Sequence, residues 1–408
     1  MSRYVRRPGA DSHAGALELF YDLVFVFAVT QVSHLLLDHL TWEGVGQSAL
    51  ILLVVWWAWN YTTWVTNELD LDAVPVRLML IAVMLASLLM AVAIPDAFGD
   101  DALLFAGSYV AIQVGRHVFL AFVVADGGTI ERERALQILI WFLAAGLFWI
   151  SGALAEGSAR TALWLVALAI DYSAPLMLYR VPGRRRLDQS TWNVATAHFV
   201  ERFQLFIIIA LGESIVLTGA TTTDLERDAP TLAAFALAFL GSAALWWIYF
   251  NYAARMAERR LELSEDRTRL ARDAYTYLHV LMVAGIIVSA VGDELVIAHP
   301  TDELPGEEVA AVVAGPAIYL FAQALFRLRM AGSVSWKRFG GALACVAVGF
   351  VGTHASALVV MALVVAVLVT VIALETVSGA RRRARGELAP LEKLDAETAA
   401  ASGPGPVS

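Results

Sequence analysis

The sequence has 408 residues, of which 59% are hydrophobic and only 16% charged, and its formal net charge is −9. A soluble domain of this size could not cover so much apolar surface with polar side chains, so the composition excludes a soluble enzyme and predicts an all-α, polytopic membrane protein. The single cysteine, Cys345, excludes an internal disulfide and a multi-thiolate metal site. We therefore expect neither a metal ion nor a cofactor.

Long apolar segments run through almost the whole chain. A membrane-spanning helix needs about 20 mostly apolar residues. The N-terminal segment 1–16 leads into the first such run without a small-residue cleavage site, so we expect the first helix to stay as an anchor. Twelve segments are predicted to span the bilayer: 17–37, 45–66, 74–95, 102–124, 135–155, 160–180, 195–219, 231–253, 273–293, 308–329, 336–354 and 356–376.

The basic residues support an even number of spans. With the N-terminus inside, the cytoplasmic segments hold 3, 1, 2, 4, 6, 4 and 5 Lys or Arg residues in chain order, which is 25 of the 29. The positive-inside rule therefore places both termini in the cytoplasm. Acidic residues follow the opposite trend and are predicted in outer loops, among them Asp293 and Glu294.

The spans and charged stretches divide the chain into five parts. They are a cytoplasmic N-terminal segment (1–16), a first six-helix half (17–180), a basic cytoplasmic linker (181–194), a second six-helix half (195–376) and a disordered cytoplasmic tail (377–408). The mixed-charge stretch 255–272 has the composition of a helix and is predicted to extend a membrane helix into the cytoplasm.

The two halves begin alike. ELFYDLVFVFAVTQ at 18–31 and ERFQLFIIIALGES at 201–214 both place Glu, then Phe two residues later, at the start of a span. The next span of each half contains a double Trp followed by Asn and Tyr: Trp56, Trp57, Asn60 and Tyr61, then Trp246, Trp247, Asn251 and Tyr252. Six spans per half predict a parallel 6+6 repeat about an axis along the membrane normal. The alternative is chance resemblance between apolar segments.

Polar side chains at membrane depth are the candidate functional residues, because each buried charge costs about 2.5–3.5 kcal/mol and needs a partner. Those selected are Glu18, Asp22, Gln31, His34, Arg116, Asp171, His198, Glu201, Arg202, Glu213 and Ser214. Two interpretations stay open: a pathway for protons or cations, or buried salt bridges that fix helix register. For Arg202, local pairing with Glu201 or snorkelling to the interface is the alternative.

Several motifs are missing. The sequence has no phosphate-binding loop, zinc-protease helix motif, nucleophile elbow or dinucleotide fingerprint. It also lacks a long basic stripe for nucleic acid. We therefore expect no ATP-driven transport by that route, no enzyme activity and no nucleic-acid partner.

The motifs ELFYDLVFVFAVTQVSHLL at 18–36 and HFVERFQLFIIIALGESIV at 198–216 closely resemble those of the bacterial low temperature requirement protein A family. The likeness extends over roughly 14–376, and it implies a multi-pass protein of the bacterial inner membrane without a defined reaction. Tyr21 stands where the family usually has Phe, and Gln204 where Gly is common. A more limited similarity, confined to Phe20, Asp22 and Phe25, is to two-repeat potassium channels.

The leading functional hypothesis is a cation- or proton-linked transporter or channel. In it, Glu18, Asp22, Glu201 and Glu213 form a polar centre on the first helices of the two halves, with Arg116 as their counter-charge. A second hypothesis is a non-transporting scaffold or sensor for membrane adaptation to cold, whose partner is the lipid bilayer. A third, an enzyme acting on lipid, is the least supported, because no nucleophile is paired with a base at helical spacing.

Overall fold

The structure is a computed structural model that describes residues 4–6, 13–192, 194–388, 392–393 and 396. Within these ranges the regular secondary structure is entirely helical, and β-type pairing is limited to two isolated bridges, Val5–Leu69 and Glu303–Ser356. This confirms the all-α fold class. The chain forms two compact units, Met1–Arg202 (unit 1) and Phe203–Ser408 (unit 2), and their boundary falls inside one helix.

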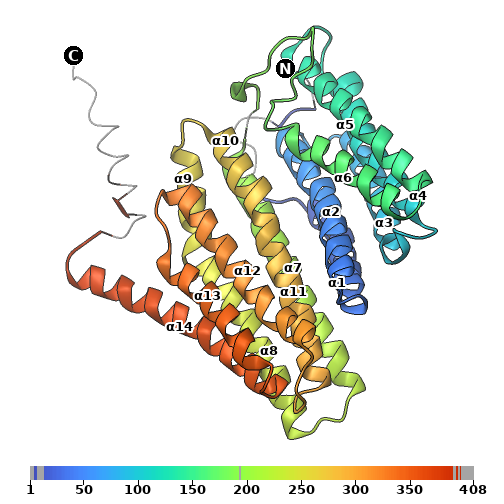
Figure 1. The fold of residues 1–408 in the computed structure, drawn as a ribbon. Coiled ribbons are helices and arrows are strands. Elements are labelled where there is room, and N and C mark those ends of the chain that lie inside the picture. The colour runs from blue at the N-terminus through green and yellow to red at the C-terminus, as the bar shows by residue number, and fades with distance from the viewer. Residues whose placement is uncertain (1–3, 7–12, 193, 389–391, 394–395, 397–408) are drawn as a thin grey trace. The chain divides into compact units, whose positions relative to one another are not determined.

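Unit 1 consists of consecutive long helices, and their connections are short except for the stretch 174–195 between α6 and α7 (Figure 1). The beginning of α7 belongs to this unit, so its first turns pack with helices that are far away in sequence. The elements are α1 (Ala16–Asp38), α2 (Trp42–Glu68), α3 (Val74–Val92), the 3₁₀ turn η1 (Ile94–Asp96), α4 (Ala102–Phe119), the π turn η2 (Leu120–Val124), α5 (Ile130–Leu154), α6 (Gly157–Ser173), the 3₁₀ turn η3 (Gln189–Thr191) and α7 (Thr196–Asp224).

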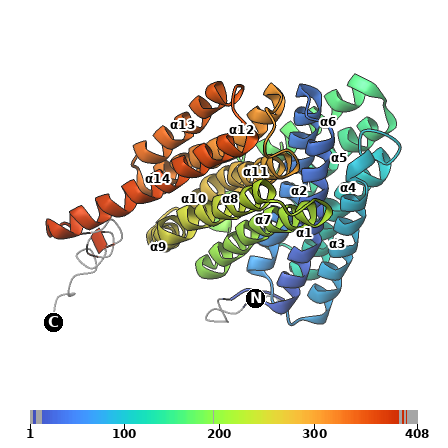
Figure 2. The same cartoon turned by 90° about the horizontal axis from the view of Figure 1, so that it is seen from below.

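Unit 2 contains the rest of α7 and the remaining helices. These are α8 (Ala229–Ile248), the π turn η4 (Tyr249–Ala253), α9 (Ala254–Leu263), α10 (Arg267–Ala271), the π turn η5 (Arg272–Leu278), α11 (His279–Ala298), α12 (Gly306–Ala331), α13 (Trp336–Gly352) and α14 (Ala357–Ala384). Figures 1 and 2 show α11 alongside both α12 and α8. The helical extension predicted over 255–272 is confirmed, because α9 and α10 continue α8 and α11 beyond their apolar parts.

Ten helical segments of the described chain are long and apolar enough to cross a membrane. Each of the twelve predicted spans coincides with a helix, but α6 and α13 have only 17 residues each and fall short of this criterion. The short stretch between the last two predicted spans separates α13 from α14, so these are two helices and not one bent segment.

Local sequence signals set several helix starts. Thr41 and Thr129 precede α2 and α5, and their hydroxyls accept hydrogen bonds from Gly44 N and Arg132 N, which satisfies backbone donors of the first helical turn. The helix α12 ends at Ala331 and is followed by Gly332, whose positive φ of 64° suits glycine at a helix C-terminus.

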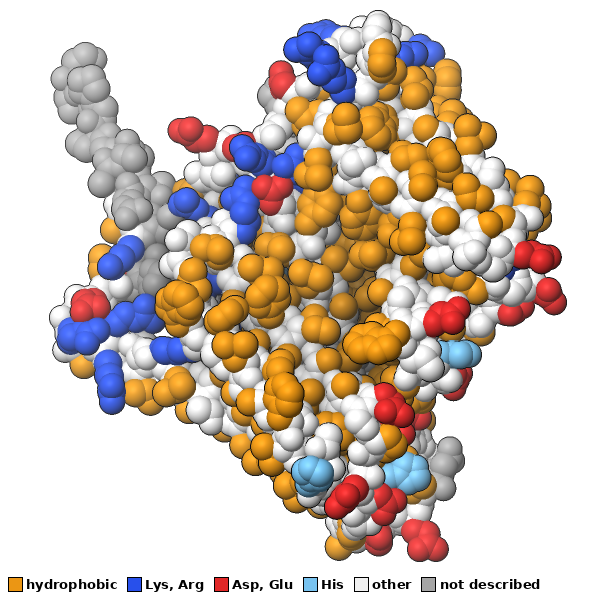
Figure 3. Space-filling model, in the orientation of Figure 1, with side chains coloured by type: hydrophobic (Ala, Val, Ile, Leu, Met, Phe, Trp, Pro, Cys, Tyr) orange, Lys and Arg blue, Asp and Glu red, His pale blue; other side chains and the backbone are white. Residues whose placement is uncertain are grey.

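On the surface, charged side chains gather near helix ends, with apolar side chains between them. On the face of unit 2 drawn in Figure 3, Lys and Arg gather near α9, α10 and the end of α14, whereas Asp and Glu gather near the α11–α12 connection. Large apolar side chains such as Leu147 (70% exposed) and Phe350 (81%) lie on the surface of the two units. Such a band is expected where lipid covers a protein.

The helices α11 and α12 approach each other unusually closely. A Cβ atom added to Gly285 would lie 2.7 Å from Tyr319 N, and one added to Gly292 would lie 2.8 Å from Val312 Cα. Backbone atoms cannot give way easily, so only glycine fits at these contacts. This contact places Pro316 of α12 beside α11.

Two of the predicted parts lie at the ends of the chain, the N-terminal segment 1–16 and the tail 377–408. The helix α14 continues to Ala384, so the first residues of the segment predicted as a disordered tail are helical. Most of that tail, and most of the N-terminal segment 1–16, lie outside the described residues.

Candidate functional site

Four charged or ionisable side chains meet inside unit 1. Glu18 and Asp22 lie on α1, His198 and Arg202 lie on the first turns of α7, and none is more than 1% exposed. Each pair is four residues apart, so each helix presents its pair on one face. We call these four residues the charge cluster.

Arg202 joins the two carboxylates of the charge cluster. Its Nη2 donates to Asp22 Oδ1 at 2.7 Å, and its Nη1 lies 3.8 Å from Glu18 Oε1. On the other side of Glu18, Oε2 lies 2.8 Å from His198 Nε2. Charged hydrogen bonds of this kind are strong where water is excluded, so the four side chains hold α1 and the start of α7 together.

Further donors fix the two carboxylates. Trp59 Nε1 on α2 donates to Asp22 Oδ1 at 2.8 Å, and the Trp59 ring centre lies 6.0 Å from Arg202 Cζ. At the beginning of α1, Gly15 N donates to Glu18 Oε2 at 3.1 Å. One buried indole of α2 thus contacts both partners of the Asp22–Arg202 ion pair.

The ring of His198 is held in place by its neighbour Asn67 at the end of α2. The Asn67 amide is oriented by the backbone of Ala195, because Ala195 N donates to its Oδ1 (2.9 Å) and its Nδ2 donates to Ala195 O (3.0 Å). The same Nδ2 lies 3.0 Å from His198 Nδ1. Asn67 thus contacts Nδ1 of the His198 ring, while Nε2 of the same ring faces Glu18.

The buried carboxylates of the cluster outnumber its guanidinium groups. Glu18 and Asp22 are two carboxylates, and Arg202 is the one arginine among the four residues. Among the described residues, Asp22 Oδ2 accepts no hydrogen bond. Burying a carboxylate without full compensation of its charge is costly.

A second guanidinium approaches the cluster from the N-terminal segment. Arg6 Nη2 lies 3.1 Å from His198 Nε2, and Arg6 is only partly buried. The backbone bonds Arg6 N–Glu68 O (3.0 Å) and Asp70 N–Tyr4 O (2.8 Å) tie this segment to the end of α2. Arg6 therefore supplies positive charge at the rim of the cluster, from outside the helices.

Another set of buried polar side chains is linked by hydrogen bonds in unit 1. Tyr109 Oη donates to Asp171 Oδ2 at 2.8 Å, and Gln113 Nε2 donates to Tyr109 Oη at 3.1 Å. Arg116 donates to Gln113 Oε1 and, at 2.7 Å, to Thr62 Oγ1. This chain crosses from α6 through α4 to α2.

The prediction that Arg116 is the counter-charge of the acidic residues is wrong. The described polar contacts of Arg116 are to Thr62, Gln113 and the Tyr61 ring, not to the acidic residues. Arg202, for which local pairing or snorkelling was the alternative, is fully buried and pairs with Glu18 and with Asp22, which lies 180 residues earlier in the sequence. Whether Arg202 faces the acids of α1 depends on how α7 is rotated about its axis, and the sequence pattern does not specify that rotation.

Glu201 does not join the charge cluster. Its side chain is 33% exposed, its Oε2 accepts from Ala14 N at 2.7 Å, and its Oε1 lies 3.4 Å from His13 Nδ1. The two motif glutamates, Glu18 and Glu201, thus have different surroundings although they occupy matching motif positions.

The remaining predicted residues lie elsewhere. Gln31 is partly buried and His34 is exposed, so this pair does not extend the charge cluster. Glu213 (1% exposed) and Ser214 (2%) belong to the part of α7 in unit 2. Ser214 Oγ donates to Asp293 Oδ2 at 3.2 Å and lies 2.8 Å from Ser242 Oγ.

Sequence reasoning missed Asp293, Asn67 and Arg338. Asp293 was predicted in an outer loop beside Glu294, but α11 continues to Ala298 and includes both. Arg338 was counted as a cytoplasmic charge, yet it is fully buried and makes two hydrogen bonds to Glu375, at 2.9 and 3.1 Å. Each has polar neighbours in the sequence, which made it resemble a loop or a helix end, and no motif singled it out.

Comparisons with known proteins agree with the motif resemblance. The family model described as bacterial low temperature requirement A protein (LtrA) matches residues 13–373. A protein of Rhizobium meliloti (strain 1021), described as uncharacterized protein RA0937, is 36% identical over 322 residues, which cover 78% of each chain. No solved structure matches. The matched range of the family contains the whole charge cluster and Asp293.

Proposed function

Because the chain belongs to the bacterial low temperature requirement A family and is a multi-pass membrane protein, we propose that it carries a proton or a small cation across the bilayer. The observation that carries this proposal is the charge cluster, where two fully buried carboxylates share one fully buried guanidinium. Ionisable groups at membrane depth commonly mark ion or proton pathways. No reaction and no cofactor enter the proposal, and we do not expect an enzyme.

Arg6 has a specific part in this proposal. Its guanidinium supplies at the rim the positive charge that the buried cluster lacks, and it lies on a segment outside the helices. We propose that a proton or cation neutralises Asp22 when Arg6 is displaced. Arg6 then competes with the transported ion, so its removal should favour uptake of the ion.

We propose twelve spans, a location in the bacterial inner membrane and cytoplasmic termini. The helices α6 and α13, with 17 residues each, are about 26 Å long. They need only a few flanking residues to reach the roughly 30 Å of a bilayer core. The basic residues then face the cytoplasm, and the charge cluster lies near that side.

A pair of matching contacts supports the proposed 6+6 repeat. Gln113 donates to Tyr109 Oη on α4 at 3.1 Å, and Gln323 donates to Tyr319 Oη on α12 at 3.3 Å. Each glutamine also accepts from an arginine: Arg116 in unit 1 and Arg338 in unit 2. These helices are the fourth of each proposed half. The tryptophan pairs do not match in this way.

The difference between the tryptophan pairs lies in their burial. Trp56 and Trp57 are 1% and 0% exposed, whereas Trp246 and Trp247 are 46% and 47% exposed. The side chain of Tyr252 lies outside the described residues. The Tyr–Gln contacts are therefore the better argument for the repeat.

Ion flux in proteoliposomes tests the function. Purified full-length protein is reconstituted, and flux is followed with a pH-sensitive dye under a proton gradient and, separately, with a cation gradient. We expect Asp22→Asn to lower the flux by at least about tenfold and Arg6→Ala to raise it. The matched control is Asp72→Asn, whose carboxylate is 92% exposed.

The same experiment distinguishes transport from the alternative function of a scaffold or sensor. Equal flux through the wild type, Asp22→Asn and Asp72→Asn, no larger than in empty liposomes, would remove the transport proposal. A drop in melting temperature for Asp22→Asn without any flux in the wild type would favour a scaffold or sensor, in which the cluster only fixes helix register.

A further inference from the structure

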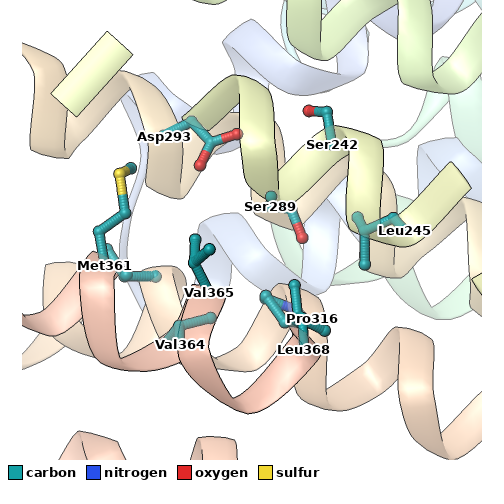
Figure 4. A pocket seen from close by; sticks show the side chains of 11 residues that line it. Ser242, Leu245, Ser289, Asp293, Pro316, Met361, Val364, Val365 and Leu368 are labelled. Carbon is teal, nitrogen blue, oxygen red and sulfur yellow. The ribbon is translucent and has the colours of Figure 1, made fainter. Parts of the chain in front are cut away.

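A small cavity of about 20 Å³ lies inside unit 2, between α8, α11, α12 and α14. Its lining is mostly apolar, but Ser242, Ser289 and Asp293 bring oxygen atoms to it (Figure 4). A space of this size holds about one water molecule or one small ion. It is distinct from the charge cluster, all of whose residues belong to unit 1.

The hydroxyl protons around this cavity are all directed to protein acceptors. Ser214 Oγ donates to Asp293 Oδ2 (3.2 Å), so in the 2.8 Å contact between the two serines Ser242 must donate to Ser214. Ser289 Oγ donates to Gly285 O at 2.8 Å. The hydroxyl oxygens therefore offer only lone pairs to the cavity. Such a lining suits a cation and repels an anion.

Pro316 leaves a backbone carbonyl of α12 without its helical hydrogen bond. Proline has no N–H, so the carbonyl of the residue four positions earlier, Val312, lacks its usual helical partner. Val312 and Pro316 both line the cavity. Interrupted helices in membrane proteins commonly turn such released carbonyls toward a bound ion. The close contact of α11 and α12 at Gly292 holds Val312 next to Asp293.

The charge of the lining selects the valence of the ion. Asp293 is the single acidic residue among the described lining residues, and these include no Lys, Arg or His. A monovalent cation would neutralise it, whereas a divalent cation would leave an excess charge in a low-dielectric interior. A full carboxylate charge and few oxygen ligands favour a small ion with a strong field over a larger one.

We propose that this cavity is a sodium-binding site formed by Asp293, Ser242, Ser289 and the Val312 carbonyl, with Ser214 orienting the Asp293 carboxylate. The proposal concerns binding and holds whether or not the protein transports. Figure 4 shows the Asp293 carboxylate and the Ser242 hydroxyl facing each other across the site.

Thermal melting of the purified full-length protein in detergent tests the site, with NaCl, KCl and choline chloride compared at equal ionic strength. We expect a saturable rise in Tm with Na⁺ alone. Asp293→Asn should abolish this rise, and Ser242→Ala should weaken the apparent affinity by about tenfold. Asp22→Asn should keep the rise, which separates this site from the charge cluster.

Pro316→Ala gives an independent signature. Alanine restores the N–H that bonds to the Val312 carbonyl, so the variant should melt at a higher temperature without Na⁺ and yet respond about tenfold more weakly to it. If Asp293→Asn does not fold, Pro316→Ala and Ser242→Ala still test the proposed sodium site.

Binding of radioactive ²²Na⁺ to the same samples provides a direct readout. The proposal is overturned if choline chloride or KCl gives the same shift as NaCl, if Asp293→Asn still responds, or if no salt has an effect, in which case the cavity holds water only.

Discussion

The charge cluster of unit 1 and the cavity of unit 2 differ in how the charge of an aspartate is balanced. Both hold an aspartate among the helices of one unit: Asp22 is buried and Asp293 is partly buried. In unit 1, Arg202 is anchored to Asp22 at 2.7 Å and supplies a fixed positive charge. In unit 2, Asp293 meets only a hydroxyl, Ser214 Oγ at 3.2 Å, among its described polar contacts.

This difference separates a permanent counter-charge from an exchangeable one. The guanidinium of Arg202 is part of the chain and cannot leave, so it permanently balances one carboxylate of unit 1. Only the second carboxylate is left to bind an ion. Hydroxyls and a released carbonyl carry no net charge, so Asp293 needs an ion from solution. The two regions should therefore respond differently to substitution and to salt.

The largest effect is expected when the fixed counter-charge is removed. Arg202→Met leaves Glu18 and Asp22 buried without their partner and should destabilise unit 1 by about 3–5 kcal/mol. We expect a large drop in melting temperature, measured by size-exclusion chromatography after heating. The triple variant Arg202→Met, Glu18→Gln, Asp22→Asn should recover most of it, because no charge is left unpaired. A single variant as stable as the wild type would contradict the assigned ion pairs.

A smaller effect is expected at the packing that shapes the unit 2 cavity. Gly292→Ala places a Cβ 2.8 Å from Val312 Cα, and such overpacking costs about 1–3 kcal/mol. The matched control is Gly212→Ala on α7, where nothing lies within 4 Å of the added atom. We expect a lower Tm for the first variant only. Equal melting of the two variants would show that α11 and α12 are not in such close contact.

The smallest effect concerns an exposed carboxylate outside the spans. Asp228 caps α8, and the hydrogen bond that it accepts from Thr231 N lowers its pKa below the ordinary value of 3.8. A carboxyl group with a lowered folded-state pKa adds stability above its unfolded pKa and loses it as the pH falls through the folded value.

Asparagine caps a helix about as well as aspartate but does not titrate. The Tm difference between the wild type and Asp228→Asn should therefore favour the wild type above about pH 4 and shrink as the pH falls below it. A difference that stays constant across this range would contradict the lowered pKa. Neither the charge cluster nor the cavity should affect this comparison.

Much of this fold could be predicted because apolar length and periodicity are local properties. Glu18 and Asp22, for example, are four residues apart, and this spacing alone puts both on one face of a helix. The partners of these acids could not be predicted, because whether Arg116 or Arg202 reaches them depends on how distant helices rotate and pack. Asp293 was missed because its polar neighbours resemble a loop, although α11 continues for five residues beyond it to Ala298.

The most direct test of the transport proposal is a measurement on vesicles that contain one variant each and that report internal pH and ²²Na⁺ together under an imposed ion gradient. The account predicts movement of a proton or cation with wild-type protein and with Asp72→Asn, and almost none with Asp22→Asn. Movement that is unchanged by Asp22→Asn, or that is absent from all three samples, would contradict it.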